Sequence, residues 1–313
     1  MAHGLHAVLL MTLVTDRVLD PAALRALSGR TNADGTVRLG VHAGLLFGCG
    51  WLVAVAGPWM LLPAILVFGI VQVALFAPAH ETMHQTAFAS RRANAIVGWL
   101  TACPSLLNAQ FYAAFHLAHH RHTQVPGRDP ELDTPPPADL AGYVRRVLGI
   151  PYWRLRLRVI ADCWRGDLSA YPYVGDAVRD RVVLSVRAMS LTMVGGSVVA
   201  AMLFGWATPF VFWIGPQLIG QPILRAYLLT EHTGCTQDRN GLTNTRTTLT
   251  NPVVRLLMWN MSFHAEHHLY PSIPFYRLAD AHAVLRDRLA VVQPGYVRWN
   301  QDFIRRLAAR DAG

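Results

Sequence analysis

The chain has 313 residues, of which 52% are hydrophobic and only 15% are charged, and its mean hydropathy is +0.26. This composition argues against an ordinary soluble protein and favours an integral membrane protein. The formal net charge is +9, all 28 basic residues are arginine, and we expect no nucleic acid among the partners.

The first half of the chain contains several apolar segments. Residues 5–14 are too few to cross a bilayer and lack the basic start of a secretory signal, so we expect them to be cytosolic or interfacial. Residues 39–57 and 60–79 have bilayer length and are joined by the uncharged turn Gly57-Pro58-Trp59, which predicts a pair of spans. Residues 93–108 are short and contain a proline, which favours a re-entrant or interfacial helix.

The second half repeats this arrangement after a polar region. Residues 126–137 are rich in proline and predict a loop. Residues 143–165 interleave arginines with apolar side chains and two tryptophans, a composition that predicts a helix on an anionic membrane surface, or one that docks an acidic protein. Residues 182–204 and 208–229 predict a second pair of spans, joined by Gly205-Trp206-Ala207.

The arginines indicate the orientation of these spans. Twelve of them lie between residues 91 and 181, and none lies in either tight turn. The positive-inside rule therefore places the central region and both termini in the cytosol, beneath the cell inner membrane. We predict one all-α integral membrane domain over residues 1–313, with four transmembrane helices in two hairpins. Residues 80–181 and 230–313 would form a cytosolic helical cap that holds a histidine-rich dinuclear metal site.

Three histidine clusters, which we call boxes 1, 2 and 3, recur along the chain. Residues three or four apart on a helix share a face, so their imidazoles can converge on one point. Neutral imidazole is a common ligand of iron, zinc and copper. One such pair arises often by chance, but three at matching spacing favour a metal site over histidines that merely decorate interfacial helices. Box 1 is His80 and His84, box 2 is His116, His119 and His120, and box 3 is His264, His267 and His268.

A polar stripe marks the last predicted span. Gln217, Gln221 and Arg225 recur every four residues, and His232 continues the same face one turn beyond the bilayer. Polar groups are costly in lipid, so the stripe should face protein, water or substrate, or should form hydrogen bonds between helices. For His232 we predict metal ligation.

Residues 40–285 resemble the membrane fatty acid desaturase and hydroxylase superfamily. The three boxes match that family's motifs in order and spacing, and Leu-Tyr-Pro follows box 3, as in the acyl-lipid members. The resemblance implies a four-span, mushroom-like fold whose cytosolic cap binds two iron ions. The implied ligands are the eight box histidines and the lone histidine after the fourth span: His80, His84, His116, His119, His120, His232, His264, His267 and His268.

Four more residues are assigned lesser roles. His122, Asp129 and Glu131 lie in a segment that resembles bacterial members, and we expect them to support the ligands rather than to bind metal. Asn260 is predicted to bind a metal through water.

The resemblance implies O2-dependent oxidation of an unactivated C–H bond in a lipid chain. We interpret the reaction as desaturation of an acyl lipid, the substrate entering an apolar tunnel between spans and cap. The alternative is a hydroxylase or ketolase that acts on a carotenoid, a sphingolipid or another aliphatic substrate. A third, non-enzymatic interpretation is a membrane metal transporter or a haem protein.

Electrons must come from an external donor. The four cysteines, Cys49, Cys103, Cys163 and Cys235, form no Cys-x-x-Cys motif and indicate neither an iron–sulfur site nor a disulfide framework. A ferredoxin or cytochrome with an acidic face would suit the positive charge. The same charge equally fits the positive-inside signal and contact with lipid.

Overall fold

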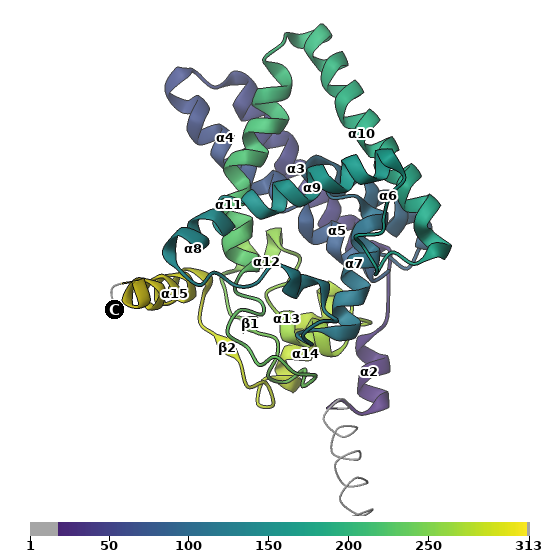
Figure 1. The fold of residues 1–313 in the computed structure, drawn as a ribbon, viewed down its shortest axis with the longest axis vertical. Helices are drawn as coiled ribbons and strands as arrows, with labels where there is room; N and C mark the ends of the chain where they lie inside the picture. Colours follow the sequence, from purple (N-terminus) through teal and green to yellow (C-terminus); the bar gives the residue numbers. More distant parts are fainter. Residues whose placement is uncertain (1–17, 312–313) are drawn as a thin grey trace, which may run out of the picture.

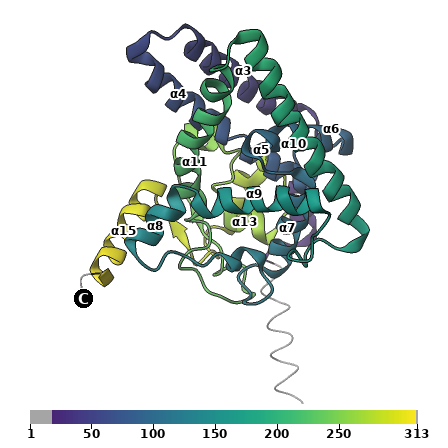
Figure 2. The ribbon, with the colours of Figure 1, turned by 45° about the horizontal axis from the view of Figure 1, so that its top comes forward.

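Helices α3, α4, α10 and α11 project together from one side of the molecule in the computed structural model, which describes residues 18–311 (Figures 1 and 2). Three stretches are long and apolar enough to cross a membrane: α3, α4 continued into α5, and α10. The predicted interfacial segment at residues 5–14 lies outside the described residues. These elements are α3 (Ala33–Val55), α4 (Pro58–Val73), α5 (Phe76–Met83), α10 (Asp176–Phe204), the π-helical turn η3 (Phe210–Ile214) and α11 (Gly215–Leu228).

The two predicted tight turns are present. Pro58 stands at the first position of α4, where its missing N–H costs nothing and its fixed φ favours the helix. Gly205 ends α10 with φ at +97°, a conformation that favours glycine. Both hairpins begin earlier than predicted, because α3 and α10 start in the polar sequence before their apolar segments.

The predicted fourth span at 208–229 differs from a regular helix. It consists of η3 followed by α11, which has only 14 residues. Pro216 has no N–H to donate to the carbonyl of Phe212, four residues earlier. Gln72 Nε2, from α4, donates to that oxygen instead at 3.0 Å. The irregular backbone is therefore satisfied by a neighbouring helix, as buried backbone in a membrane requires.

Small residues and amides join α11 to α4. A Cβ on Gly220 would lie 2.4 Å from the carbonyl oxygen of Gly69, so the two backbones touch directly. Gln217 Nε2 donates to Gln72 Oε1 at 2.9 Å, and Gln221 Nε2 donates to Gln217 Oε1 at 3.2 Å. Of the alternatives for the glutamine stripe, hydrogen bonding within and between helices is the one observed.

The remaining elements gather around and below the inner ends of these helices (Figure 1). Two short parallel strands, which the all-α prediction did not include, pair Thr247 with Val292 and Thr248 with Gln293. These elements are α2 (Pro21–Leu27), α6 (Arg91–Ala102), η1 (Cys103–Ser105), α7 (Ala109–His122), η2 (Pro130–Asp133), α8 (Leu140–Val147), α9 (Ile150–Arg165), β1 (Thr247–Thr248), α12 (Pro252–Leu257), α13 (His264–Leu269), η4 (Phe275–Arg277), α14 (Leu278–Leu285), β2 (Val292–Gln293) and α15 (Tyr296–Asp311).

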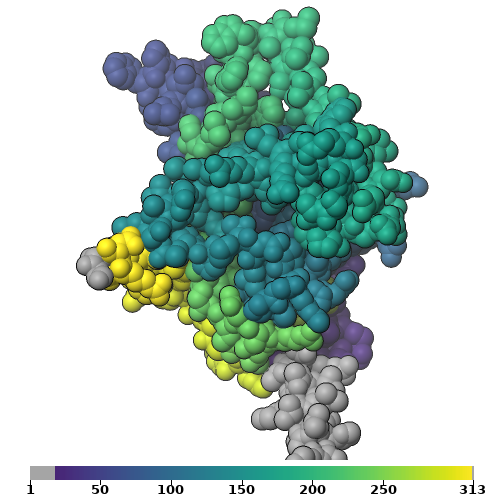
Figure 3. All heavy atoms as spheres, in the orientation of Figure 1, coloured from purple at the N-terminus to yellow at the C-terminus, as the bar shows by residue number. Residues whose placement is uncertain are grey.

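The arginine-rich segment forms two helices rather than one. Gly149, with φ at +74°, separates α8 from α9. One face of α9 is buried: Val159 and Cys163 pack in a cluster with Phe111 of α7 and Val182 of α10. The segment therefore lies against protein on one side, and in the space-filling view it forms a band across the middle of the molecule (Figure 3).

Candidate metal centre

Each box lies on a different helix. Box 1 lies at the end of α5, the continuation of α4. Box 2 occupies the last turns of α7, whose first turn is fixed by Asn108 Oδ1, which accepts from the N–H groups of Gln110 and Phe111. Box 3 lies on the short helix α13. The three segments, distant in sequence, converge at one place.

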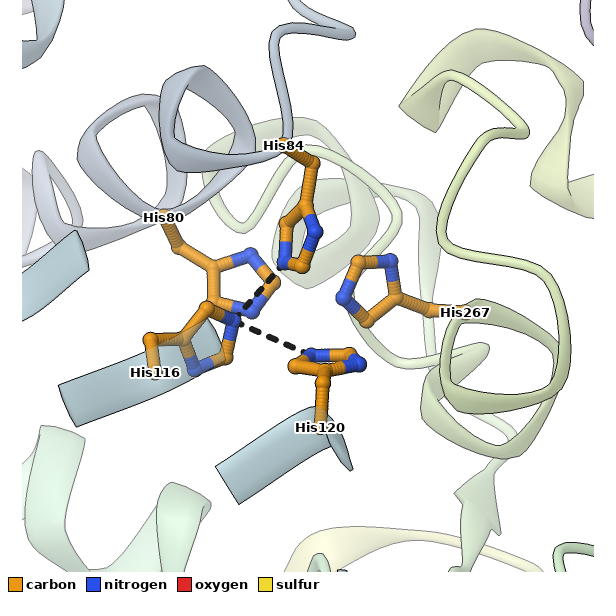
Figure 4. Close-up of side chains that lie close together, drawn as sticks. All are labelled: His80, His84, His116, His120 and His267. Atoms are coloured by element: carbon orange, nitrogen blue, oxygen red, sulfur yellow. Dashed lines mark hydrogen bonds between the residues drawn. The ribbon is translucent and has the colours of Figure 1, made fainter. Parts of the chain in front are cut away.

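Five imidazoles form the first histidine group. They are arranged around a common centre, each with a ring nitrogen directed inward (Figure 4). One candidate ligand atom from each ring lies within 4.8 Å of all the others. His116 Nε2 lies 2.8 Å from His84 Nε2 and 3.1 Å from His120 Nε2. The members are His80, His84, His116, His120 and His267.

The nitrogens of this group lack ordinary partners. Neither nitrogen of His80 or His267 has a hydrogen bond to any described residue, although both side chains are 1% exposed. Buried polar atoms are nearly always satisfied, so a set of unpartnered nitrogens that face one another calls for a cation between them. These residues fit a metal ion that prefers imidazole.

Three further imidazoles form the second histidine group: His119, His232 and His268. Their candidate ligand atoms also lie within 4.8 Å of one another. His264 adjoins them, because its Nε2 lies 3.3 Å from His232 Nε2 and its ring centre lies 4.5 Å from that of His268. Stacking of His120 on His268, with ring centres 4.0 Å apart, brings the two groups into contact.

Outer hydrogen bonds orient the second group. His119 Nδ1 donates to Asp129 Oδ1 at 2.9 Å, and His232 Nδ1 donates to the carbonyl oxygen of Asn244 at 3.1 Å. The hydroxyl of Thr123 donates to a backbone carbonyl, so it can accept from His268 Nδ1, 3.1 Å away. Each contact engages Nδ1, so Nε2 is the nitrogen of the ring that would bind a metal.

Two glutamates lie at the inner face of the second group. Glu131 Oε2 is 3.2 Å from His119 Nε2, so it contacts the nitrogen that a metal would use, whereas Asp129 contacts the opposite one. Glu231 Oε2 is 3.5 Å from His264 Nε2. Glu231 was not among the predicted site residues, although its position directly before His232 is a signal.

Burial keeps most of these rings neutral. It lowers the pKa of His116, His264, His267 and His268 well below the usual value, and neighbouring imidazoles lower it further. The pKa of His84 falls to about 3 and that of His232 to about 4, mainly by burial. Burial also lowers the pKa of His119, but Glu131 and Asp129 raise it by more, so the pKa of His119 lies above its usual value.

Asn260 and His122 are two of the residues with predicted supporting roles. The amide of Asn260 is used elsewhere: its Nδ2 donates to the carbonyl oxygen of Phe275 at 3.0 Å, and its Oδ1 accepts from Arg255 at 3.1 Å. With φ at +58°, Asn260 stabilises the turn before box 3. A contact of Asn260 with a metal through water stays a prediction. His122 belongs to neither histidine group.

A cavity of about 540 Å³ borders both histidine groups. Apolar residues such as Phe76, Phe115 and Leu228 form part of its wall, as the predicted tunnel requires. Charged side chains form another part: Arg225 belongs to the predicted polar stripe, whereas no place in the site was predicted for Arg156. The volume is within the usual range of small-molecule sites.

Comparisons with known proteins agree with this geometry. A family model described as fatty acid desaturase matches residues 56–300. The chain is 25% identical to dihydrorhizobitoxine desaturase of Bradyrhizobium elkanii, over 85% of this chain and 78% of the relative. It is 24% identical to sn-1 oleoyl-lipid 12-desaturase of Picosynechococcus, over 76% and 73%. It is 28% identical to β-carotene ketolase of a Paracoccus strain, over 73% and 81%.

Proposed function

Because this chain belongs to the fatty acid desaturase family, we propose that it oxidises an unactivated C–H bond of a lipid chain in an O2-dependent reaction at two irons. Within that class, we propose desaturation of an acyl chain. The observation that carries the proposal is the convergence of the two histidine groups beside one cavity.

The proposed ligands follow the two groups. The first histidine group would hold one iron, and His119, His232, His264 and His268 would hold the other. Two reduced irons supply the activation of dioxygen that removal of hydrogen from an unactivated methylene requires. The protein orients the rings of the second group through Asp129, Asn244 and Thr123 and keeps both groups away from bulk water.

The cavity determines which carbon is oxidised. A chain held along its apolar wall would have one carbon fixed beside the histidines, and the position of that carbon would set the regiochemistry. We further propose that α3, α4, α10 and the η3–α11 segment are four spans of the inner membrane, with the histidines and both termini at the cytosolic side. The electrons would come from an external ferredoxin or cytochrome.

A hydroxylase or ketolase is the second candidate. The 28% identity to a β-carotene ketolase favours it. A non-enzymatic transporter or haem protein is set aside, since the matching relatives are desaturases and a ketolase.

Lipid analysis of a host that expresses the chain separates the two candidates. Desaturation predicts products that are lighter by one pair of hydrogens, detected by mass spectrometry, and that depend on O2. Products that gain oxygen would replace the desaturase assignment with the hydroxylase or ketolase one. An expressed, iron-loaded protein that alters no lipid of the host would count against both.

A further inference from the structure

Two arginines in the cavity wall lack a partner. Arg156, on α9, is 7% exposed, and Arg225, on α11, is partly buried. The Nε–H of each is buried and donates to no acceptor among residues 18–311, and neither guanidinium forms an ion pair there. Burying an unpaired charge costs free energy. Two such arginines in one cavity wall therefore indicate that a ligand supplies the missing partner.

Tyr152 holds the two arginines close together. The Arg225 guanidinium lies 4.3 Å from the centre of its ring and the Arg156 guanidinium 5.1 Å from it. The hydroxyl of Tyr152 donates to the carbonyl oxygen of Ser105 at 2.5 Å, which fixes the ring. These cation–π contacts orient both planar groups but leave their N–H donors unused.

Most of the other charged groups on the cavity wall already have partners; within residues 18–311 the exceptions are Asp133 and Oε1 of Glu231, which are acidic. Glu131 contacts His119 and Glu231 contacts His264. Arg146 donates to the carbonyl oxygens of Thr134 and Pro135, and Arg158 lies 3.6 Å from Asp162. The positive charge available to a ligand therefore comes from Arg156 and Arg225.

The arginines and the histidines share one cavity. Tyr112 lines it and stacks on His116, with ring centres 5.1 Å apart. Apolar side chains such as Leu155 and Leu228 lie along the same wall. A ligand can thus place an anionic group at the arginines and an aliphatic part beside the histidines.

We propose that the substrate carries a carboxylate or a phosphate that Arg156 and Arg225 bind together. The inference rests on the proposed function in that it takes the cavity for the substrate site. The planar guanidinium fork matches both anions, and two such forks give geometric specificity as well as charge. A neutral hydrocarbon such as a carotene would leave both charges unpaired.

Binding measured by calorimetry on the purified, full-length, iron-loaded protein in a neutral detergent tests this assignment. The probes are octanoate, octyl phosphate and octanol, which share one chain. At least one anion should bind about tenfold or more tightly than octanol, the discrimination expected of a charged hydrogen bond. Preference for octanoate indicates a free acid, and preference for the phosphate indicates a phosphorylated substrate or lipid headgroup. Equal binding of all three would overturn the proposal.

Variants locate the effect. Arg156→Gln and Arg225→Gln should each remove most of the preference for the anion. Arg154→Gln is the matched control, because Arg154 lies on the same helix but is exposed and outside the cavity wall. If a glutamine variant fails to fold by gel filtration, Arg156→Lys and Arg225→Lys keep the charge without the fork and should retain a weaker preference. Anion binding unaffected in the folded variants would refute the assignment.

The outcomes separate this inference from the proposed function. Arginine-dependent binding of an anion by a protein that oxidises no lipid leaves the inference standing and defeats the oxidase proposal. Oxidation of a neutral lipid that persists in the folded arginine variants would support the oxidase proposal and overturn the inference.

Discussion

Asp129 decides which nitrogen of His119 faces the other imidazoles. Its carboxylate accepts from Nδ1, and it also accepts from the backbone N–H groups of Gln124 and Glu131, so it is itself held in place. Asn244 and Thr123 act in the same way on His232 and His268. The second histidine group is therefore oriented from outside, whereas His80 and His267 have no such contact with the part of the chain that the structure describes.

Loss of single rings from the first histidine group tests its role. Replacing His84, His120 or His267 by alanine should abolish turnover through loss of iron, while the spans stay inserted. Even an outer hydrogen-bond partner typically contributes about tenfold to metal affinity, so loss of a ligand should cost at least that. Iron per protein, measured by mass spectrometry after purification, checks the expectation.

His122→Ala is the matched control for these variants. His122 lies on α7 with box 2, yet it belongs to neither histidine group, and its ring forms no hydrogen bond to a ligand ring within residues 18–311. The control should keep its iron. A ligand variant with unchanged iron content and activity would contradict the assignment of that ring.

The helices show what the sequence could and could not predict. The spacing of the histidines predicted that each box lies on one face of a helix. The length of the apolar segments predicted α3, α4 and α10. Both properties can be read from neighbouring residues, because they are local. The π-helical turn before Pro216 could not be predicted in the same way. It depends on Gln72 of another helix, which donates to the carbonyl left free by the proline. Likewise, the sequence did not predict the break at Gly149 or the burial of Arg156 on α9, the helix that follows it.

The contact between α4 and α11 gives a prediction at the scale of elements. Gly220→Ala should destabilise the folded protein by about 1–3 kcal/mol, because its Cβ would meet backbone atoms of Gly69 that cannot move aside. Thermal unfolding in detergent would show a lower midpoint. In Gly196→Ala, on α10, the added Cβ meets nothing within 4 Å, so this variant should match or exceed the wild type. Equal behaviour of the two variants would mean that the close contact does not limit stability.

At the scale of the molecule, topology explains why three distant boxes meet. The sequence predicted the convergence, since two hairpins of helices return the chain to the same end of the molecule. How the rings divide between the two histidine groups depends on how α5, α7 and α13 are rotated about their own axes. Side-chain packing sets that rotation. His119 and His120 are neighbours in sequence yet fall in different groups because successive helical residues point in different directions. Glu231 and the arginine pair also arise only when separate segments assemble.

The surface supports a single membrane orientation. Trp59 and Trp206, in the two tight turns, are 94% and 78% exposed, as expected of aromatic side chains at a lipid interface. Large apolar side chains of α3 and α10, including Phe47 and Met202, are exposed along the same part of the molecule. Arginines flank the opposite ends, which predicts that the turns face away from the cytosol and that the histidines lie at the cytosolic side.

Reporter fusions in a bacterial host test this orientation. Alkaline phosphatase, which is active only outside the cytosol, should be active when fused after Ala207 and inactive when fused after Gly313. A fluorescent protein that matures in the cytosol should give the opposite result at the same two sites. The arginines explain the expectation, because twelve lie in residues 91–181 and translocating them would oppose the membrane potential. Active phosphatase at the C-terminus would place the histidines after the last span outside the cytosol, where a cytosolic ferredoxin could not reach them.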